Sequence, residues 1–307
     1  MKAQHLGERT MKSATKILRF ILVPKVSHPW YDEVRQGALA QAELLSNEHL
    51  RIDIEYQAPL NTQHGTQRRI LSAVATHPPS GLAIDPIESP IQIAELRSLQ
   101  DMGVPVVLFD APTAHSGLCA VGNDFYEQGS VAAEHLIREI NGRGKVAIMK
   151  GVPTAPNHQQ RYEAQYAALS RHPGIVIVEG GTDYDDIDLA EQEAERTLST
   201  HQDLRGYLCC DAAGPVGIAA AIRRRGIAHQ VVAVTMDSIR PILEAIRDGV
   251  IRASSATRPR LQGALAVNML WLASQGCQLP KQIDTGIDLV TSENVHAFIA
   301  QLDAEGT

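Results

Sequence analysis

The sequence has few of the features that mark several classes of protein. Aromatic residues make up only 4% of the 307 residues, and there are four cysteines. The cysteines show neither a CxxC metal spacing nor a disulfide framework, so we interpret them as small core residues. No stretch approaches the ~20 apolar residues that span a bilayer. The segment 1–16 lacks the apolar core of a signal peptide, and the sequence alone does not say whether a leader was removed.

Positive charge is also scarce. Lys and Arg total 28 against 35 Asp and Glu, which gives a formal net charge of -7. The longest basic run, Arg223–Arg225, falls near the end of a predicted helix, where cations complement the helix dipole. No run is long enough to form the basic patch that nucleic-acid binding requires, so we expect no nucleic-acid partner.

The usual signatures of catalysis and of cofactor binding are missing. After the first predicted strand the chain reads PKVSHPW, which lacks the GxGxxG fingerprint of dinucleotide binding. There is no phosphate-binding GxxxxGK[ST] loop, no GxSxG nucleophile elbow and no HExxH zinc motif. We therefore expect a protein that is not an enzyme and that uses no cofactor.

The sequence does contain a regular alternation of short Val- and Ile-rich runs with longer segments of helical period. Continuous apolar strands, each followed by a helix, are typical of parallel sheets covered on both faces. This pattern predicts a doubly wound α/β protein. The predicted strands are 17–23, 52–56, 81–84, 104–109, 118–121, 146–149, 175–178, 206–210, 231–235, 252–256 and 287–290. The predicted helices are 31–45, 66–75, 90–102, 127–140, 160–170, 188–199, 214–225, 239–248 and 261–274, with a final helix over 292–302.

The alternation is interrupted once, at Val121–Asp124, and a second series of strand–helix units begins at Val146. A single sheet of eleven strands would be unusually wide, so two similar α/β halves fit the length better. We expect the first 15 residues to form a flexible tail.

Polar residues follow the predicted strands, where open parallel sheets bind their ligands. An aspartate follows each of four strands: Asp85, Asp110, Asp211 and Asp237. Carboxylates accept paired hydrogen bonds from adjacent hydroxyls, and aromatic rings such as Trp30, Tyr31 and Tyr184 stack on the apolar faces of sugars. If the two halves face each other, these residues converge on one cleft suited to a small, uncharged, polyhydroxylated ligand.

Each of these residues also has a purely structural interpretation. An aspartate after a strand often caps the following helix. Trp30 and Tyr31 could belong to the core beneath the first helix, and His28 could be a loop residue without a partner. The four aspartates could instead hold a magnesium ion, because hard cations take oxygen ligands. Four such positions beside an aromatic pair favour a binding site.

The order of the motifs resembles that of the type I periplasmic sugar-binding proteins, the ribose-binding-protein family. The resemblance covers nearly the whole chain from about Lys16 and rests on the motifs HPWY, VPVVLFD, VGNDFYEQG, CDAAGPVGIAAAI, VVAVTMD and SSATRPRLQG. It implies two Rossmann-like lobes joined by a hinge of three crossings. The implied first lobe comprises 16–121 and 258–286, and the second comprises 122–257 and 287–303.

The resemblance also implies which residues contact the ligand. The first lobe would contribute His28, Trp30, Tyr31, Asp85 and Asp110; the second lobe would contribute Gln159, Arg161, Tyr184, Asp211 and Asp237; and the hinge would contribute Thr257. Ala111 stands where the ribose pattern has Arg, and Asp85 stands where a neutral Asn is common. These departures argue against an acidic sugar and against ribose itself. They favour a pentose, deoxysugar or linear polyol and leave a cationic solute open.

The resemblance therefore implies a monomeric periplasmic protein that delivers a small sugar or polyol to the membrane permease of an ABC-type importer. A sensory role for the same fold, in which a membrane receptor or histidine kinase reads the closed form, is the alternative.

Overall fold

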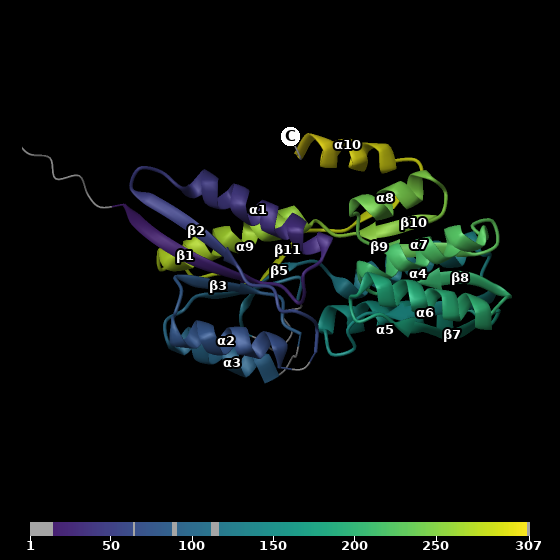
Figure 1. Ribbon diagram of the computed structural model, residues 1–307, viewed down its shortest axis with the longest axis horizontal. Helices are drawn as coiled ribbons and strands as arrows, with labels where there is room; N and C mark the ends of the chain where they lie inside the picture. The colour runs from purple at the N-terminus through teal and green to yellow at the C-terminus, as the bar shows by residue number, and fades with distance from the viewer. Residues whose placement is uncertain (1–14, 64, 88–90, 112–116, 306–307) are drawn as a thin grey trace, which may run out of the picture.

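The computed structural model describes residues 15–63, 65–87, 91–111 and 117–305. Within them the chain forms two α/β lobes side by side, each built on one six-stranded sheet (Figure 1). The predicted flexible tail lies outside the described residues except for Thr15, whose hydroxyl donates to the main-chain oxygen of Glu48. The predicted fold class is confirmed.

The first lobe is an all-parallel sheet covered by helices, with strand order β11-β5-β4-β3-β1-β2. Helices α1 and α9 pack against each other on one face, and α2 and α3 lie together on the other. Its strands are β1 (Lys16–Val23), β2 (Leu50–Tyr56), β3 (Gly81–Ile84), β4 (Val106–Phe109), β5 (Cys119–Gly122) and β11 (Gln282–Asp284). Its helices are α1 (Pro29–Leu45), α2 (Thr66–Thr76), α3 (Ile91–Asp101) and α9 (Pro259–Ser274).

The second lobe repeats this plan with strand order β12-β10-β9-β8-β6-β7. Its strands are β6 (Gly144–Lys150), β7 (Ile175–Thr182), β8 (Leu204–Leu208), β9 (Val232–Met236), β10 (Ala253–Ala256) and β12 (Asp288–Thr291). Its helices are α4 (Phe125–Glu139), α5 (Pro156–Ser170), α6 (Ile187–Thr200), α7 (Ala213–Arg225), α8 (Arg240–Arg247) and α10 (Val295–Glu305).

The chain passes between the lobes three times. The connections lie between β5 and α4, between β10 and α9, and between β11 and β12. They coincide with the expected crossings near residues 121–123, 256–258 and 286–288. The residue at which each rigid lobe begins stays a prediction.

The structure differs from the sequence prediction at two edge strands. The strand β11 was not predicted, because three residues of mixed polarity (QID) carry no apolar pattern, and its pairing with β5 comes from tertiary contact. The strand β12 pairs with β10 in the antiparallel direction, whereas only parallel strands were expected. Its sheet is therefore mixed, as doubly wound sheets with an antiparallel edge often are.

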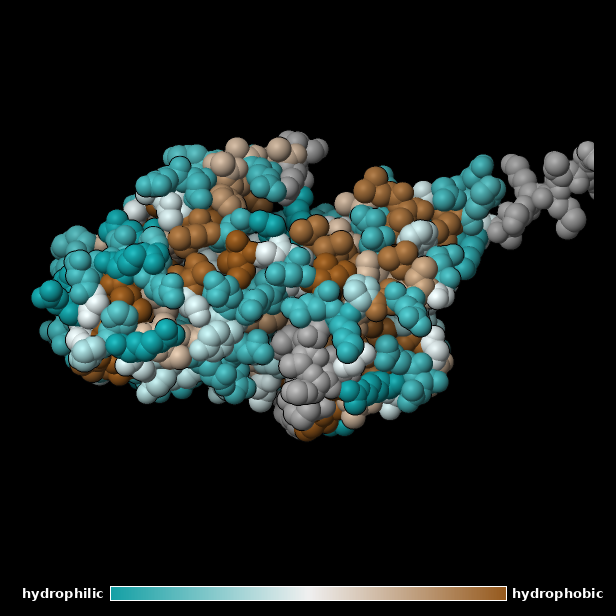
Figure 2. Space-filling model, turned by 180° about the vertical axis from the view of Figure 1, so that it is seen from behind, coloured by the Kyte–Doolittle hydropathy of each residue, from teal (hydrophilic) through white to brown (hydrophobic). Residues whose placement is uncertain are grey.

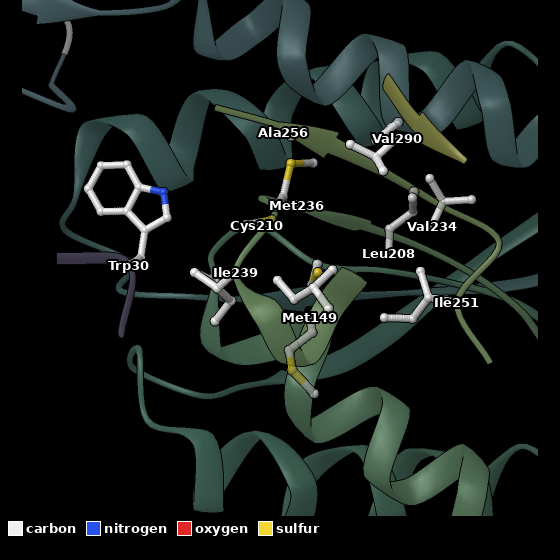
Figure 3. Packing of buried hydrophobic residues seen from close by; sticks show 14 of the residues in the cluster. Trp30, Met149, Leu208, Cys210, Val234, Met236, Ile239, Ile251, Ala256 and Val290 are labelled. Carbon is white, nitrogen blue, oxygen red and sulfur yellow. The ribbon is translucent and has the colours of Figure 1, made fainter. Parts of the chain in front are cut away.

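The largest apolar cluster extends through both lobes, and a second cluster beneath α2 and α3 belongs to the first lobe alone. Helices α1 and α9 approach so closely that a Cβ added at Gly37 would lie 1.9 Å from the main-chain oxygen of Arg260. Trp30, at the start of α1, belongs to the same buried cluster as Met236 and Ile239 of the second lobe (Figure 3). The indole therefore connects the cores of the two lobes.

On the surface, seen from behind, apolar residues form small groups separated by polar ones, and one of these groups lies at the junction of the lobes (Figure 2).

Candidate ligand-binding cleft

The topology brings the two switch points of the sheets to the junction of the lobes. In the first sheet the order in which successive strands are added reverses between β1 and β3, and in the second sheet it reverses between β6 and β8. Ligands of open α/β sheets bind beyond the carboxyl ends of strands at such points, because the flanking connections part there. The segment after β1 and the residue after β3 meet at the first switch point, and the start of α5 lies near the residue after β8 at the second.

At the first switch point a buried lysine pairs with two carboxylates. Lys25 Nζ donates to Asp85 Oδ2 (2.5 Å) and lies 3.8 Å from Asp110 Oδ2, and the Tyr31 hydroxyl donates to the same Asp85 oxygen (2.9 Å). Burial raises the pKa of Asp85 to about 7, although Lys25 opposes this. Burial also lowers the pKa of Lys25, but Asp85 and Asp110 outweigh it and raise that pKa above its ordinary value.

Asp110 is the point where the lobes meet directly. The side-chain amide of Asn157, on α5, donates to its main-chain oxygen (2.7 Å) and to its Oδ2 (2.6 Å). Arg161, one turn further along α5, lies 3.5 Å from Asp110 Oδ1 and donates to Gln128 Oε1 and the main-chain oxygen of Cys210. Asp110 has a φ of 46°, a left-handed conformation that non-glycine residues seldom adopt outside functional sites.

A chain of hydrogen bonds links the first helix to the hinge and the second lobe. Trp30 Nε1 donates to Thr257 Oγ1 (2.9 Å), and that hydroxyl donates to Asp237 Oδ1 (2.5 Å). Asp237 also has a positive φ, 66°. Thr257 therefore joins one residue from each lobe at the second crossing.

A group of carboxyls without cationic partners occupies the second lobe. Asp183 and Asp211 lie side by side, so burial and then its neighbour raise the pKa of Asp183 well above the ordinary value, and a shared proton would bond the two. Asp211 Oδ1 accepts from the Gly214 N–H (2.9 Å) in the first turn of α7, although the N-cap of that helix is Ala212. Burial and nearby cations lower the pKa of His158 well below its ordinary value, so this imidazole is neutral.

Most of the predicted site residues surround one small cavity of about 10 Å³, the space of a single water. It is lined by His28, Trp30, Tyr31, Asp110, His158, Arg161, Asp185, Ala212 and Asp237. Asp85, Asp211 and Thr257 contact or adjoin these residues from behind. Trp30 and Tyr31 are both buried core residues and cavity-lining residues, so the two interpretations hold together.

Two predicted residues lie elsewhere. The expectation that Gln159 faces the cleft is wrong: its side chain is exposed and bonds Glu163 on the same helix. Residues 157 and 161 are four apart and share a face of α5, so residue 159 points away. Tyr184 is 50% exposed and lines a larger outer cavity of about 920 Å³, which opens beside the inner one.

Five buried polar residues of the cleft were not predicted: Lys25, Asn157, His158, Asp183 and Asp185. Signals for some of them were present. Lys25 lies in the segment PKVSHPW after the first strand, and Asp183 follows the β7 strand directly. Their burial could not be inferred from position alone, because lysine and aspartate at strand ends are usually exposed.

Within the described residues, no group of three or more His, Cys, Asp or Glu side chains is arranged to hold a metal ion. The magnesium site considered above therefore has no geometric support there. In the same part of the chain, no helix combines the length and the apolar character needed to cross a membrane.

Comparison with known proteins identifies the family. A family model described as a periplasmic binding protein domain matches residues 20–278, so the chain belongs to that family. An ABC transporter solute-binding protein from Burkholderia graminis, solved in complex with D-arabinose, is 28% identical; the match has a TM-score of 0.84 and covers 92% of this chain and 98% of that one. A D-ribose/D-allose-binding protein from Pseudomonas aeruginosa is 26% identical over 75% of this chain and 76% of its own length.

A xylose/arabinose-binding protein from Sulfolobus acidocaldarius is 23% identical over 84% of this chain and 68% of its own length. The fold, the family and the names of its relatives thus define a type I periplasmic sugar-binding protein.

Proposed function

We propose that this protein captures a small sugar or polyol between its lobes, outside the cytoplasmic membrane, and delivers it as a monomer to the permease of an ABC-type importer. The supporting observation is that buried hydrogen-bonding side chains from both lobes and the hinge converge at the two switch points. Relatives named for sugar binding support the same ligand class. No covalent chemistry is required of the residues in the cleft.

Capture requires the lobes to part. An inner cavity of about 10 Å³ does not accommodate a pentose, so the contacts between Asp110 and Asn157 must open before a solute enters. A solute that then contacts both lobes favours the closed form by its differential affinity for the two states. Ala111 stands where the ribose pattern supplies arginine, which favours a pentose, deoxysugar or linear polyol over ribose.

The test is a thermal-shift screen of the purified protein against pentoses, hexoses, deoxysugars, polyols and small amines, followed by calorimetry. A solute at a thousandfold excess over its Kd stabilises the folded state by roughly 4 kcal/mol. Asp110→Ala and Asp237→Ala should each weaken binding by ~1–3 kcal/mol, because buried polar partners are left unpaired. Gln159→Ala, on the exposed face of α5, is the control.

Unchanged affinity in both aspartate variants would refute this site. Binding of no solute in the screen would refute the function. The relatives described above are named for sugar binding and none for sensing, so the sensory alternative has no support from them.

A further inference from the structure

The cleft holds every buried charged residue in the described part of the chain, and acidic groups dominate. The buried aspartates are Asp85, Asp110, Asp183, Asp185, Asp211 and Asp237. The only buried lysine or arginine residues among the described ones are Lys25 and Arg161. A buried charge is costly unless it is paired, so with two cations for six carboxyls the remaining carboxyls must either hold a proton, as the raised pKa of Asp183 indicates, or take up positive charge from a ligand.

The two cations lie beside Asp85 and Asp110. Lys25 pairs with both carboxyls, and Arg161 lies 3.5 Å from Asp110. Within the described residues no lysine or arginine forms an ion pair with Asp183, Asp185 or Asp211. Arg161 attracts Asp211 and Asp237, and Lys25 attracts Asp185, only at longer range. The carboxyls without a cationic partner therefore lie on the second-lobe side of the cleft.

Asp185 is held at the wall between the two cavities and lines both of them. It has a φ of 65°, next to Tyr184 at 55°. Two contacts fix this unusual turn: Asp183 Oδ1 accepts from the Asp185 N–H (3.0 Å), and Thr62 Oγ1 of the first lobe donates to the Tyr184 main-chain oxygen (3.1 Å). Strain of this kind persists where the surroundings enforce it, and here it places a carboxylate in the cleft.

A second and independent observation points to a ligand at the same place. His28, from the first lobe, lines both cavities and is 5% exposed. Its Nδ1 accepts from the Trp30 N–H, but its Nε2 has no hydrogen-bond partner. Buried polar atoms are rarely left without partners, so His28 Nε2 is suited to a bound solute.

The outer cavity is lined by negatively charged side chains, like the inner part of the cleft. Three aspartates, Asp185, Asp186 and Asp188, line the outer cavity, and no lysine or arginine appears among the described residues that line it. Low-dielectric walls that carry one sign of charge raise the local concentration of the opposite sign. This cavity therefore attracts cations toward Asp185.

From these observations we propose that the solute is a polyhydroxylated amine, an amino sugar or amino alditol, whose ammonium group binds Asp185 while a neighbouring hydroxyl bonds His28 Nε2. The inference rests on the proposed function and narrows its ligand class. An ammonium group offers three donors and a full positive charge, whereas a hydroxyl donates once and leaves the carboxylates uncompensated.

The experiment compares matched probes by isothermal titration calorimetry: D-glucosamine with D-glucose and N-acetyl-D-glucosamine, D-galactosamine with its two counterparts, and 1-amino-1-deoxy-D-sorbitol with D-sorbitol. For at least one skeleton we expect the amine to bind tenfold or more tightly than its neutral parent. Asp185→Asn should remove that preference while the neutral parent's affinity changes by less than twofold. Asparagine tolerates a positive φ, so this variant should keep the turn.

Asp203→Asn is the matched control, because it removes the same charge from an exposed position of the second lobe that lines neither cavity. It should leave the preference within twofold of the original value. If neutral parents bind as tightly as their amines, the amine inference fails and the sugar-binding function stands. If no sugar, polyol or amine binds, the proposed function fails and the inference fails with it. If Asp185→Asn keeps the preference, the placement of the ammonium group at Asp185 is refuted.

Discussion

The side-chain amide of Asn157 in the second lobe donates two hydrogen bonds to Asp110 in the first lobe, at 2.7 and 2.6 Å. This pair joins the two lobes directly across the cleft, together with the bonds through Thr257 and Thr62. It also sets a competition, because a solute that uses Asp110 must replace the amide or share the carboxylate with it. The closed form thus depends on a small number of named polar contacts.

Asn157→Ala should shift the solute-free protein toward the open form. Hydrogen bonds to charged groups contribute about 1.5–3 kcal/mol, so the loss of this contact should lower the ratio of closed to open molecules by an order of magnitude or more. The radius of gyration from small-angle X-ray scattering should increase. Gln159→Ala, two residues along the same helix, should leave it unchanged; an equal radius for both variants would contradict the prediction.

Lys25→Met should destabilise the fold, because it leaves Asp85 and the adjacent Asp110 buried without their cation. Removing one partner of a buried ion pair typically costs about 3–5 kcal/mol. Urea denaturation measures the loss. The double variant Lys25→Met/Asp85→Asn should recover part of it, since one uncompensated carboxylate is then gone. A single variant as stable as the wild type would show that the pair contributes nothing.

The stability of the protein should fall as the pH rises from about 4 to about 7. The pKa of Asp85 is raised to about 7, so the folded state retains a proton that the unfolded state releases near its ordinary pKa. Each such group lowers the unfolding free energy by up to about 1.4 kcal/mol per pH unit in that window. The raised pKa values of Asp110, Asp183 and Asp211 act in the same direction.

The variant Asp85→Asn measures the contribution of Asp85 to this pH dependence, because asparagine is neutral at every pH. Chemical denaturation at pH 4.5 and pH 7 should show a smaller pH-dependent loss in this variant than in the wild type. The exposed Asp203, whose pKa is lowered by its hydrogen bond from Lys145, provides the control variant Asp203→Asn. Equal losses in the wild type and in Asp85→Asn would contradict the raised pKa.

Gly37→Ala should destabilise the first lobe although alanine is the better helix former. The added Cβ would meet the Arg260 main-chain oxygen at 1.9 Å, so α1 and α9 must move apart. Overpacking of this kind typically costs about 1–3 kcal/mol. The midpoint of thermal unfolding measures it, with the exposed Gln36→Ala as the control. A midpoint equal to or above that of the wild type would show that α1 and α9 can move apart without loss of stability.

Much of the fold and part of the site could be predicted from the sequence. Apolar strands and helical periods are local patterns, and they predicted two α/β halves, whereas the three crossings between them were implied by the resemblance to the sugar-binding family. The positions of Asp110 and Asp237 followed from the rule that functional residues come after parallel strands. The short strand β11 was missed because its three residues carry no such pattern.

The sequence by itself determined that this is a two-lobed α/β protein with carboxylates at its strand ends, because period and strand termini are encoded locally. Only the tertiary structure decided that Lys25 is buried beside Asp85, 60 residues away, and that Asn157 rather than Gln159 faces Asp110. The tertiary structure also gathered the buried carboxyls around Asp185 that have no cationic partner. Such pairings depend on which residues the two sheets and the rotation of α5 bring within a few ångströms, and no local pattern in the chain records those distances.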